Sequence, residues 1–414
     1  MRFDGLQLTH AAMNPIVSDR SRTKTGLTHL AALDGIRGLA ILLVLPHHIR
    51  VISEPFDTLS HVWAKLGDFA WLGVEMFFVL SGFLITRILL ASQPATNYYT
   101  SFYGRRALRI LPLYYTVLAI WWFLLPVVNP ASVRGGQYGY LWLFLVNWTQ
   151  PFHASGNGVA PYWSLAVEEQ FYLFWPVLIR RLSAKFVFIL CCGLTVAALG
   201  IRTGMLTTGW PDEAVYEWTV CRMDALALGA AVAAALAVPG WREKLLTRSS
   251  WLSYSAVGVF LLGAAITRLY QQTGIFAMSA GYTLAGVAFA LWVLVIALGT
   301  NPPLDWALRS PFLQSVGKYS YAMYVLHVPV TMTLDAALKA IGWTPTIDTV
   351  WADVLRVCLY SVIAWGTAML SYRFLEAPAL RLKRYFELVY PESSQLRRIW
   401  SARTEVASAK QPLR

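Results

Sequence analysis

Charged residues are scarce in this chain. Of its 414 residues, 14% are Asp, Glu, Lys or Arg and 57% are hydrophobic, whereas a soluble domain has about 25% charged and about 45–50% apolar residues. This composition excludes an ordinary soluble domain and predicts an all-α integral membrane protein. The 18 Trp and 20 Tyr residues agree with this prediction, because such side chains anchor helices at the membrane surfaces.

Cysteine and acidic residues are scarce as well. The four cysteines lie in apolar segments and indicate neither a disulfide framework nor a metal site, so we expect no metal. Asp and Glu number 22 against 34 Lys and Arg, for a net charge of +12. The basic residues gather in short connections and tails without a nucleic-acid-binding motif, so nucleic acid is not an expected partner. Residues 1–29 lack the apolar stretch of a cleavable signal peptide.

We expect about ten transmembrane helices of the usual length near 20 residues. With ten helices, every connection rich in Lys and Arg falls on one side of the membrane, which predicts that both termini are cytoplasmic. Tyr140–Trp148 is apolar but too short to cross, so we interpret it as one re-entrant or interfacial segment; if it crosses, the count becomes eleven or more. The expected helices cover residues 34–51, 69–90, 109–128, 164–181, 186–202, 219–238, 251–268, 280–299, 319–341 and 352–376.

The first expected helix carries charges where a membrane helix normally has none. Asp34 and Arg37 are three residues apart and share a face. His48 follows Arg37 by eleven residues. This spacing turns His48 about 20° and His47 about 80° from Arg37, and sets His48 roughly 16 Å further along the helix. Ionisable groups inside a membrane usually line a polar cavity or pathway. An ion pair with a neighbouring carboxylate is an equally weighted interpretation of His48.

Arginines cluster at the start of one further expected helix, and two glutamates lie at the start of another. Arg105, Arg106 and Arg109 lie at the start of the third expected helix, where Arg106 and Arg109 can face one anion. Guanidinium groups at a helix start suit phosphate; the alternative is a basic loop that only anchors the helix. Glu168 and Glu169 lie in the first turns of the fourth expected helix. Adjacent residues diverge by about 100°, so we expect them to contact different neighbours; the alternative is helix capping plus a structural ion pair.

More polar groups lie within the second and sixth expected helices. Glu75 is a carboxylate at membrane depth, and Gly82 allows another backbone to approach closely. Arg222 and Asp224 are two residues apart and therefore lie on different faces. We expect each of them to pair with another helix.

Three further polar residues lie within the expected helices. Ser164 is the expected N-cap of the fourth helix. For His327 we favour a hydrogen-bonded core role over a catalytic one. Glu376 is expected at the end of the tenth helix, paired with Arg373 or Arg381.

Taken together and in order, these segments resemble the membrane-bound acyltransferase 3 family of bacterial O-acyltransferases, of the type that acetylates O-antigen and other polysaccharides. The resemblance runs from about Leu30 to Arg384. It rests on seven motifs: LDGIRGLAILLVLPHH, GVEMFFVLSGFLIT, FYGRRALRILPLYY, YWSLAVEEQFYLFWP, CRMDALALG, YSYAMYVLHVPV and FLEAPALR. It implies a membrane acyltransferase domain at 30–384 between a cytoplasmic N-terminal tail at 1–29 and a charged cytoplasmic C-terminal tail at 385–414. The implied location is the bacterial cytoplasmic (inner) membrane, crossed many times.

The resemblance also implies a reaction: transfer of an acyl group, most commonly acetyl from acetyl-coenzyme A, to a hydroxyl of a carbohydrate or glycoconjugate. The family's functional residues match Arg37 and His48, Arg106 and Arg109, and Glu168 and Glu169. One departure is His47 directly before His48, where many relatives have a single histidine. The spacing from Arg37 favours His48 as the acting imidazole.

The expected mechanism follows from these roles. His48 takes the hydroxyl proton as a general base. Arg105, Arg106 and Arg109 bind the phosphates of acyl-coenzyme A at the cytoplasmic face, and Arg37 holds phosphates or polarises the acyl carbonyl. The acceptor approaches from the outer side of the bilayer. The competing class is a transporter or flippase of a sugar or lipid-linked glycan, against which stands the absence of a detectable inverted repeat.

Overall fold

The computed structural model describes residues 30–52, 57–69, 71–128, 138–149, 161–267, 274–343, 347 and 349–391. Every regular element in these ranges is a helix, which confirms the all-α prediction. Ten helices match the ten expected ranges: α1 (Ala31–Ile49), α3 (Trp71–Ser92), α4 (Tyr98–Val128), α7 (Tyr162–Arg181), α8 (Ala184–Thr207), α10 (Thr219–Ala237), α12 (Ser249–Ile266), α13 (Tyr282–Leu298), α15 (Pro311–Ala340) and α16 (Val350–Ser371).

Length and composition identify seven candidate membrane spans within the described ranges. They include α1, α3, α8, α10, α12, α13 and α16. Large apolar side chains on several helices face outward, such as Phe174 and Val196, which are 65% and 70% exposed. Such a surface suits a lipid environment. The count of ten spans and the cytoplasmic position of the termini stay predictions.

Short helices connect the long ones or follow α16. They are α2 (Thr58–Asp68), α5 (Tyr138–Trp142), α6 (Val146–Thr149), α9 (Asp212–Glu217), α11 (Trp241–Leu246), η2 (Ala277–Gly281), α14 (Pro302–Leu308), η3 (Tyr372–Glu376), α17 (Ala377–Arg381) and η4 (Leu382–Phe386). The expected interfacial segment consists of α5 and α6, whose 5 and 4 residues are too short to cross a bilayer. The two expected tails lie largely outside the described residues.

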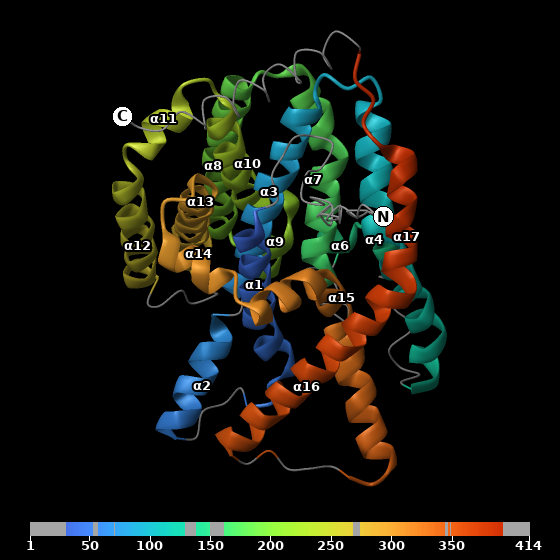
Figure 1. Cartoon of the computed structure of the whole chain (residues 1–414). Coiled ribbons are helices and arrows are strands. Elements are labelled where there is room, and N and C mark those ends of the chain that lie inside the picture. Colours follow the sequence, from blue (N-terminus) through green and yellow to red (C-terminus); the bar gives the residue numbers. More distant parts are fainter. Residues whose placement is uncertain are drawn as a thin grey trace, which may run out of the picture.

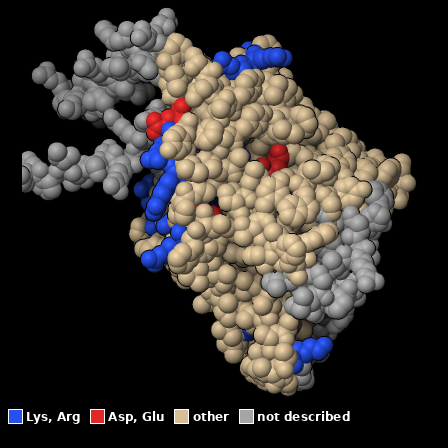
Figure 2. Space-filling view, turned by 90° about the vertical axis from the view of Figure 1, so that its right-hand side faces the viewer, with Lys and Arg blue, Asp and Glu red and all other residues tan. Residues whose placement is uncertain are grey.

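The helices form a bundle that continues into a narrower lower part. In Figure 1, α3, α4, α7, α8 and α10 stand side by side in the upper part, whereas α15 and α16 extend to the lower end of the view, where α2 and the end of α1 also lie. Figure 2 shows that Lys and Arg gather at the upper end and along one edge of one face, while most of that face carries no charged side chain.

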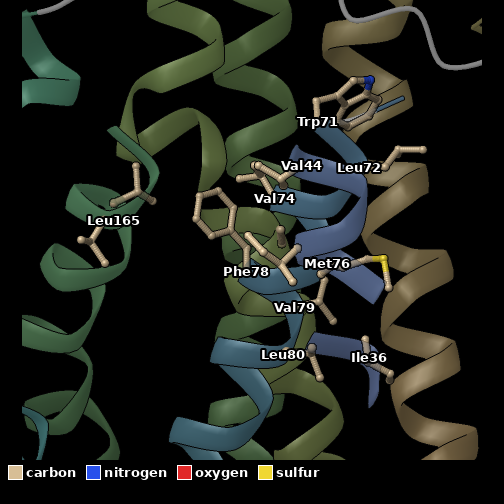
Figure 3. Close-up of a cluster of buried hydrophobic side chains, with 14 of the residues drawn as sticks. Ile36, Val44, Trp71, Leu72, Val74, Met76, Phe78, Val79, Leu80 and Leu165 are labelled. Carbon is tan, nitrogen blue, oxygen red and sulfur yellow. The ribbon is translucent and has the colours of Figure 1, made fainter. Parts of the chain in front are cut away.

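The core is built around α3. Val74, Phe78 and Leu80 of this helix are buried, and Figure 3 shows side chains of α3 between Ile36 of α1 and Leu165 of α7. Because α3 contacts α1, α7, α10 and α13, it fixes the helices that surround it.

Small residues bring α3 and α10 into backbone contact. A Cβ atom on Gly82 would meet the carbonyl of Leu226, and one on Gly229 would meet the carbonyl of Val79. Close approach of this kind allows dense packing where lipid supplies no hydrophobic driving force. The close approach expected at Gly82 is therefore confirmed.

Two buried ion pairs connect α10 to neighbouring helices, at positions two residues apart on α10. Arg222 donates to Glu75 of α3 at 2.6 Å, and Arg202 of α8 donates to Asp224 at 2.7 Å. Thr283 of α13 also donates to Asp224, at 3.0 Å. Arg222 and Asp224 thus pair with different helices, as their spacing predicts. These four charged side chains are 2% exposed or less, so their pairing holds α3, α8, α10 and α13 together.

Candidate functional site

A cavity lies between α1, α3, α4, α7 and α15. It brings together residues from five helices that are far apart in the sequence, three of them arginines. Its walls are formed by Arg37, Val74, Phe77, Phe78, Ser81, Arg106, Arg109, Ile110, Ser164, Leu165, Glu168, Ser320, Tyr321 and Tyr324. Arg105 is not among the residues that form this wall.

Arg106 lies against two carboxylates and an aromatic ring. Its guanidinium lies 3.8 Å from a Glu168 oxygen and 3.6 Å from a Glu169 oxygen, and its central carbon is 3.8 Å from the ring centre of Tyr172. Ser81 also donates to Glu168, at 2.7 Å. The expectation that the two glutamates contact different neighbours is wrong in this respect, because the long Arg106 side chain reaches both. The two carboxylates orient one cation at the cavity wall.

Arg37 of α1 and Arg109 of α4 both line the cavity. Arg37 donates to Asp34 at 3.0 Å, as expected for residues that share a face. Arg109 lies within electrostatic range of Arg37 and Glu376. Among the described residues, no ion pair joins Arg109 to a carboxylate. Two like charges at one wall attract an anion, and Arg109 has donors available for it.

Glu376 lies at the end of the tenth helix, as expected, but its neighbours differ from the expected ones. It is buried in the π-helical turn η3, and the described residues offer its Oε1 no hydrogen bond. The expected pairing with Arg373 or Arg381 is wrong. The wider π turn rotates successive side chains by a smaller angle than an α turn does, and Glu376 faces Arg109.

Ser164 is a wall residue and not a helix cap. The N-cap position of α7 belongs to Pro161, whose fixed φ suits a helix start. The Ser164 hydroxyl lies 2.5 Å from that of Tyr324, which donates to the Pro161 carbonyl at 2.7 Å. The sequence reasoning missed Tyr324. Its signal was the spacing of three residues to His327, which places both on one side of α15.

His48 lies at the other end of α1 from Arg37 and does not line the cavity. Its Nδ1 is 3.4 Å from the Val44 carbonyl. Its ring centre is 5.0 Å from that of His47 and 4.9 Å from that of His327. The interpretation of His48 as an ion-pair partner is wrong, because its charged and titratable neighbours among the described residues are the two histidines.

His327 of α15 is completely buried. Its Nδ1 lies 2.7 Å from the Tyr324 carbonyl, so the expected hydrogen bond in the core is present. The ring contact with His48 adds a feature that the sequence does not reveal. Tyr324, His327, His48 and His47 form a continuous row of rings that leads away from the cavity.

The end of α1 that carries the two histidines is held from α16. Asp353 is completely buried and accepts hydrogen bonds from the backbone N–H groups of Val51 at 3.0 Å and Ile52 at 3.0 Å, and from Trp63 Nε1 at 2.9 Å. One turn further, Arg356 donates to the Ile49 carbonyl at 3.1 Å. These contacts fix the position at which the chain leaves α1.

No group of three His, Cys, Asp or Glu residues is arranged to hold a metal ion within the part of the chain that the structure describes. The polar groups of the cavity and of the histidine row are suited instead to binding an anion and to moving protons.

Comparison with known proteins decides the family. A sequence model described as an acyltransferase domain, that of the acyltransferase 3 family, matches residues 30–373. The chain belongs to the acyltransferase 3 family. It is 28% identical over 382 residues to the peptidoglycan O-acetyltransferase OatA of Listeria monocytogenes, covering 86% of this chain and 56% of the relative. It is 25% identical over 376 residues to the O-acetyltransferase OatA of Staphylococcus aureus, covering 84% of this chain and 57% of the relative.

The chain spans little more than half the length of these acyltransferase 3 relatives. No solved structure matches it.

Proposed function

We propose that this protein transfers an acyl group, most simply acetyl, from cytoplasmic acyl-coenzyme A to a hydroxyl of a carbohydrate or glycoconjugate, with peptidoglycan as the first acceptor to test. One observation carries the proposal. Arg37, Arg106 and Arg109 come from two helices of an acyltransferase-family chain and line one cavity. The names of the relatives support acetyl as the group and peptidoglycan as the acceptor.

The arginines suit the donor because coenzyme A is a polyanion. Glu168 and Glu169 hold Arg106 in place, which reduces the side-chain entropy lost when a phosphate binds. The guanidinium N–H groups of Arg109 form no ion pair with a carboxylate among the described residues and can donate to a coenzyme A phosphate. Arg37 lies with Arg109 and apart from His48, which favours a role in holding phosphates over a role at the acyl carbonyl.

The chemistry needs a base beside the acceptor hydroxyl. As the hydroxyl oxygen bonds to the acyl carbon, the carbon–sulfur bond breaks. His48 takes the hydroxyl proton, and the leaving thiolate finally receives one proton. The row from Tyr324 through His327 to His48 links the cavity to this imidazole. The acceptor approaches His48 from the outer side of the bilayer.

Donor binding is tested by thermal denaturation of the detergent-purified protein with and without acetyl-coenzyme A. A ligand that binds only the folded state raises the denaturation midpoint. We expect a shift for the wild type that is lost in Arg109→Ala and kept in Arg242→Ala, which removes an exposed arginine of α11. Equal shifts in both variants would contradict the assigned site, and no shift with any acyl-coenzyme A would contradict the donor.

A further inference from the structure

His327 is the least explained polar group near the cavity. It is completely buried in α15, and its Nε2 has no hydrogen-bond partner among the described residues. A buried polar atom without a partner costs about 1–3 kcal/mol. An apolar side chain at this position would fill the core without that cost, so core packing alone does not explain a histidine here.

The hydrogen bonds of the two imidazoles define their basic atoms. Nδ1 of His327 lies 2.7 Å from the Tyr324 carbonyl, and Nδ1 of His48 lies 3.4 Å from the Val44 carbonyl. A carbonyl oxygen only accepts hydrogen bonds, so in each neutral ring Nδ1 carries the proton and Nε2 has the lone pair. Each imidazole therefore takes up and releases a proton at Nε2.

The ring of His327 connects the cavity with His48, the proposed base for the acceptor hydroxyl. The ring centres of His48 and His327 are 4.9 Å apart in an edge-to-face arrangement, which leaves no space for a residue between them. On its other side His327 contacts the ring of Tyr324, at 5.7 Å between centres, and Tyr324 lines the cavity. His327 thus lies between the proposed base and the proposed donor site.

We propose that His327 is the proton-transfer partner of His48. The inference rests on the proposed acyl transfer. The acceptor hydroxyl gives its proton to Nε2 of His48, this proton is shared with Nε2 of His327 while the acyl group moves, and His48 then delivers it to the thiolate released from coenzyme A. The carbon–oxygen bond replaces the carbon–sulfur bond, both imidazoles end neutral, and one proton moves from oxygen to sulfur. Sharing the proton with the adjacent imidazole of His327 stabilises the protonated form of His48 while the carbon–sulfur bond breaks.

The substitution His327→Asn separates this role from a structural one. The Asn amide N–H takes the place of Nδ1 and keeps a donor for the Tyr324 carbonyl, but it has no base at the position of Nε2. We expect a loss of transfer rate of about 100-fold or more, the usual range for a general acid–base group. The denaturation midpoint and its shift with acetyl-coenzyme A should stay close to those of the wild type. His61→Asn, at an exposed position of α2, is the matched control and should transfer normally.

A second experiment compares the single and double variants of His48 and His327. If the two imidazoles act as one unit, His48→Ala/His327→Asn loses no more activity than His48→Ala alone. Wild-type transfer by His327→Asn, or a multiplicative loss in the double variant, would overturn the inference while leaving donor binding intact. Absence of transfer and of a donor shift in the wild type would overturn the proposed function and this inference together.

Discussion

Asp353 gives the sharpest test of how the histidine end of α1 is held. In Asp353→Ala the buried N–H of Ile52 loses its acceptor, which costs about 1–3 kcal/mol. Val51 is 52% exposed, and the Trp63 bond is only partly buried. Their donors regain some water, so each loss costs about 0.5–1.5 kcal/mol. The expected total is about 2–6 kcal/mol.

The assay is thermal denaturation in detergent, beside a matched variant. Asp305→Ala removes the same side chain from an exposed ion pair with Arg309 on α14, where the expected cost is about 0–1 kcal/mol. Asp353→Ala should denature at a clearly lower temperature than Asp305→Ala and should also lose transfer activity, because the end of α1 carries His48. Equal midpoints for the two variants would refute the reasoning.

Further predictions concern the packed core. Glu75→Leu leaves Arg222 as a buried charge without its carboxylate and should cost about 3–5 kcal/mol, whereas Glu75→Leu/Arg222→Leu should recover much of that loss; a double variant less stable than Glu75→Leu would contradict the pairing. Gly82→Ala should lower the denaturation midpoint by overpacking against the Leu226 carbonyl, at about 1–3 kcal/mol. Gly193→Ala of α8 is its control, because a Cβ there meets nothing within 4 Å, and it should be neutral or stabilising. A larger loss at Gly193 than at Gly82 would contradict the close packing of α3 and α10.

The long helices were predictable because each apolar run of about 20 residues has one low-energy form in a membrane. The direction of side chains on one helix was predictable too. Arg37 and Asp34 share a face, and Arg222 and Asp224 reach different helices. Helical geometry supplies these relations without knowledge of any neighbour.

Contacts between helices were not predictable, because they depend on which helix packs beside which. The angle between Arg37 and His48 on a helical wheel does not show that the cavity includes Arg37 and leaves out His48. Nor does it show that α15 brings His327 against His48. Glu376 faces Arg109 because a π turn interrupts the helix, and local sequence does not specify such a turn.

The most direct test is acetyl transfer in proteoliposomes from acetyl-coenzyme A that carries a radiolabelled acetyl group, with peptidoglycan fragments as acceptor. The account predicts label in the glycan for the wild type, a labelling rate lower by about 100-fold or more for His48→Ala, and a raised donor KM for Arg109→Ala. Labelling by His48→Ala at the wild-type rate would contradict the proposed base. Labelling that neither substitution affects would contradict the assignment of the arginine cavity and the histidine row to the transfer reaction.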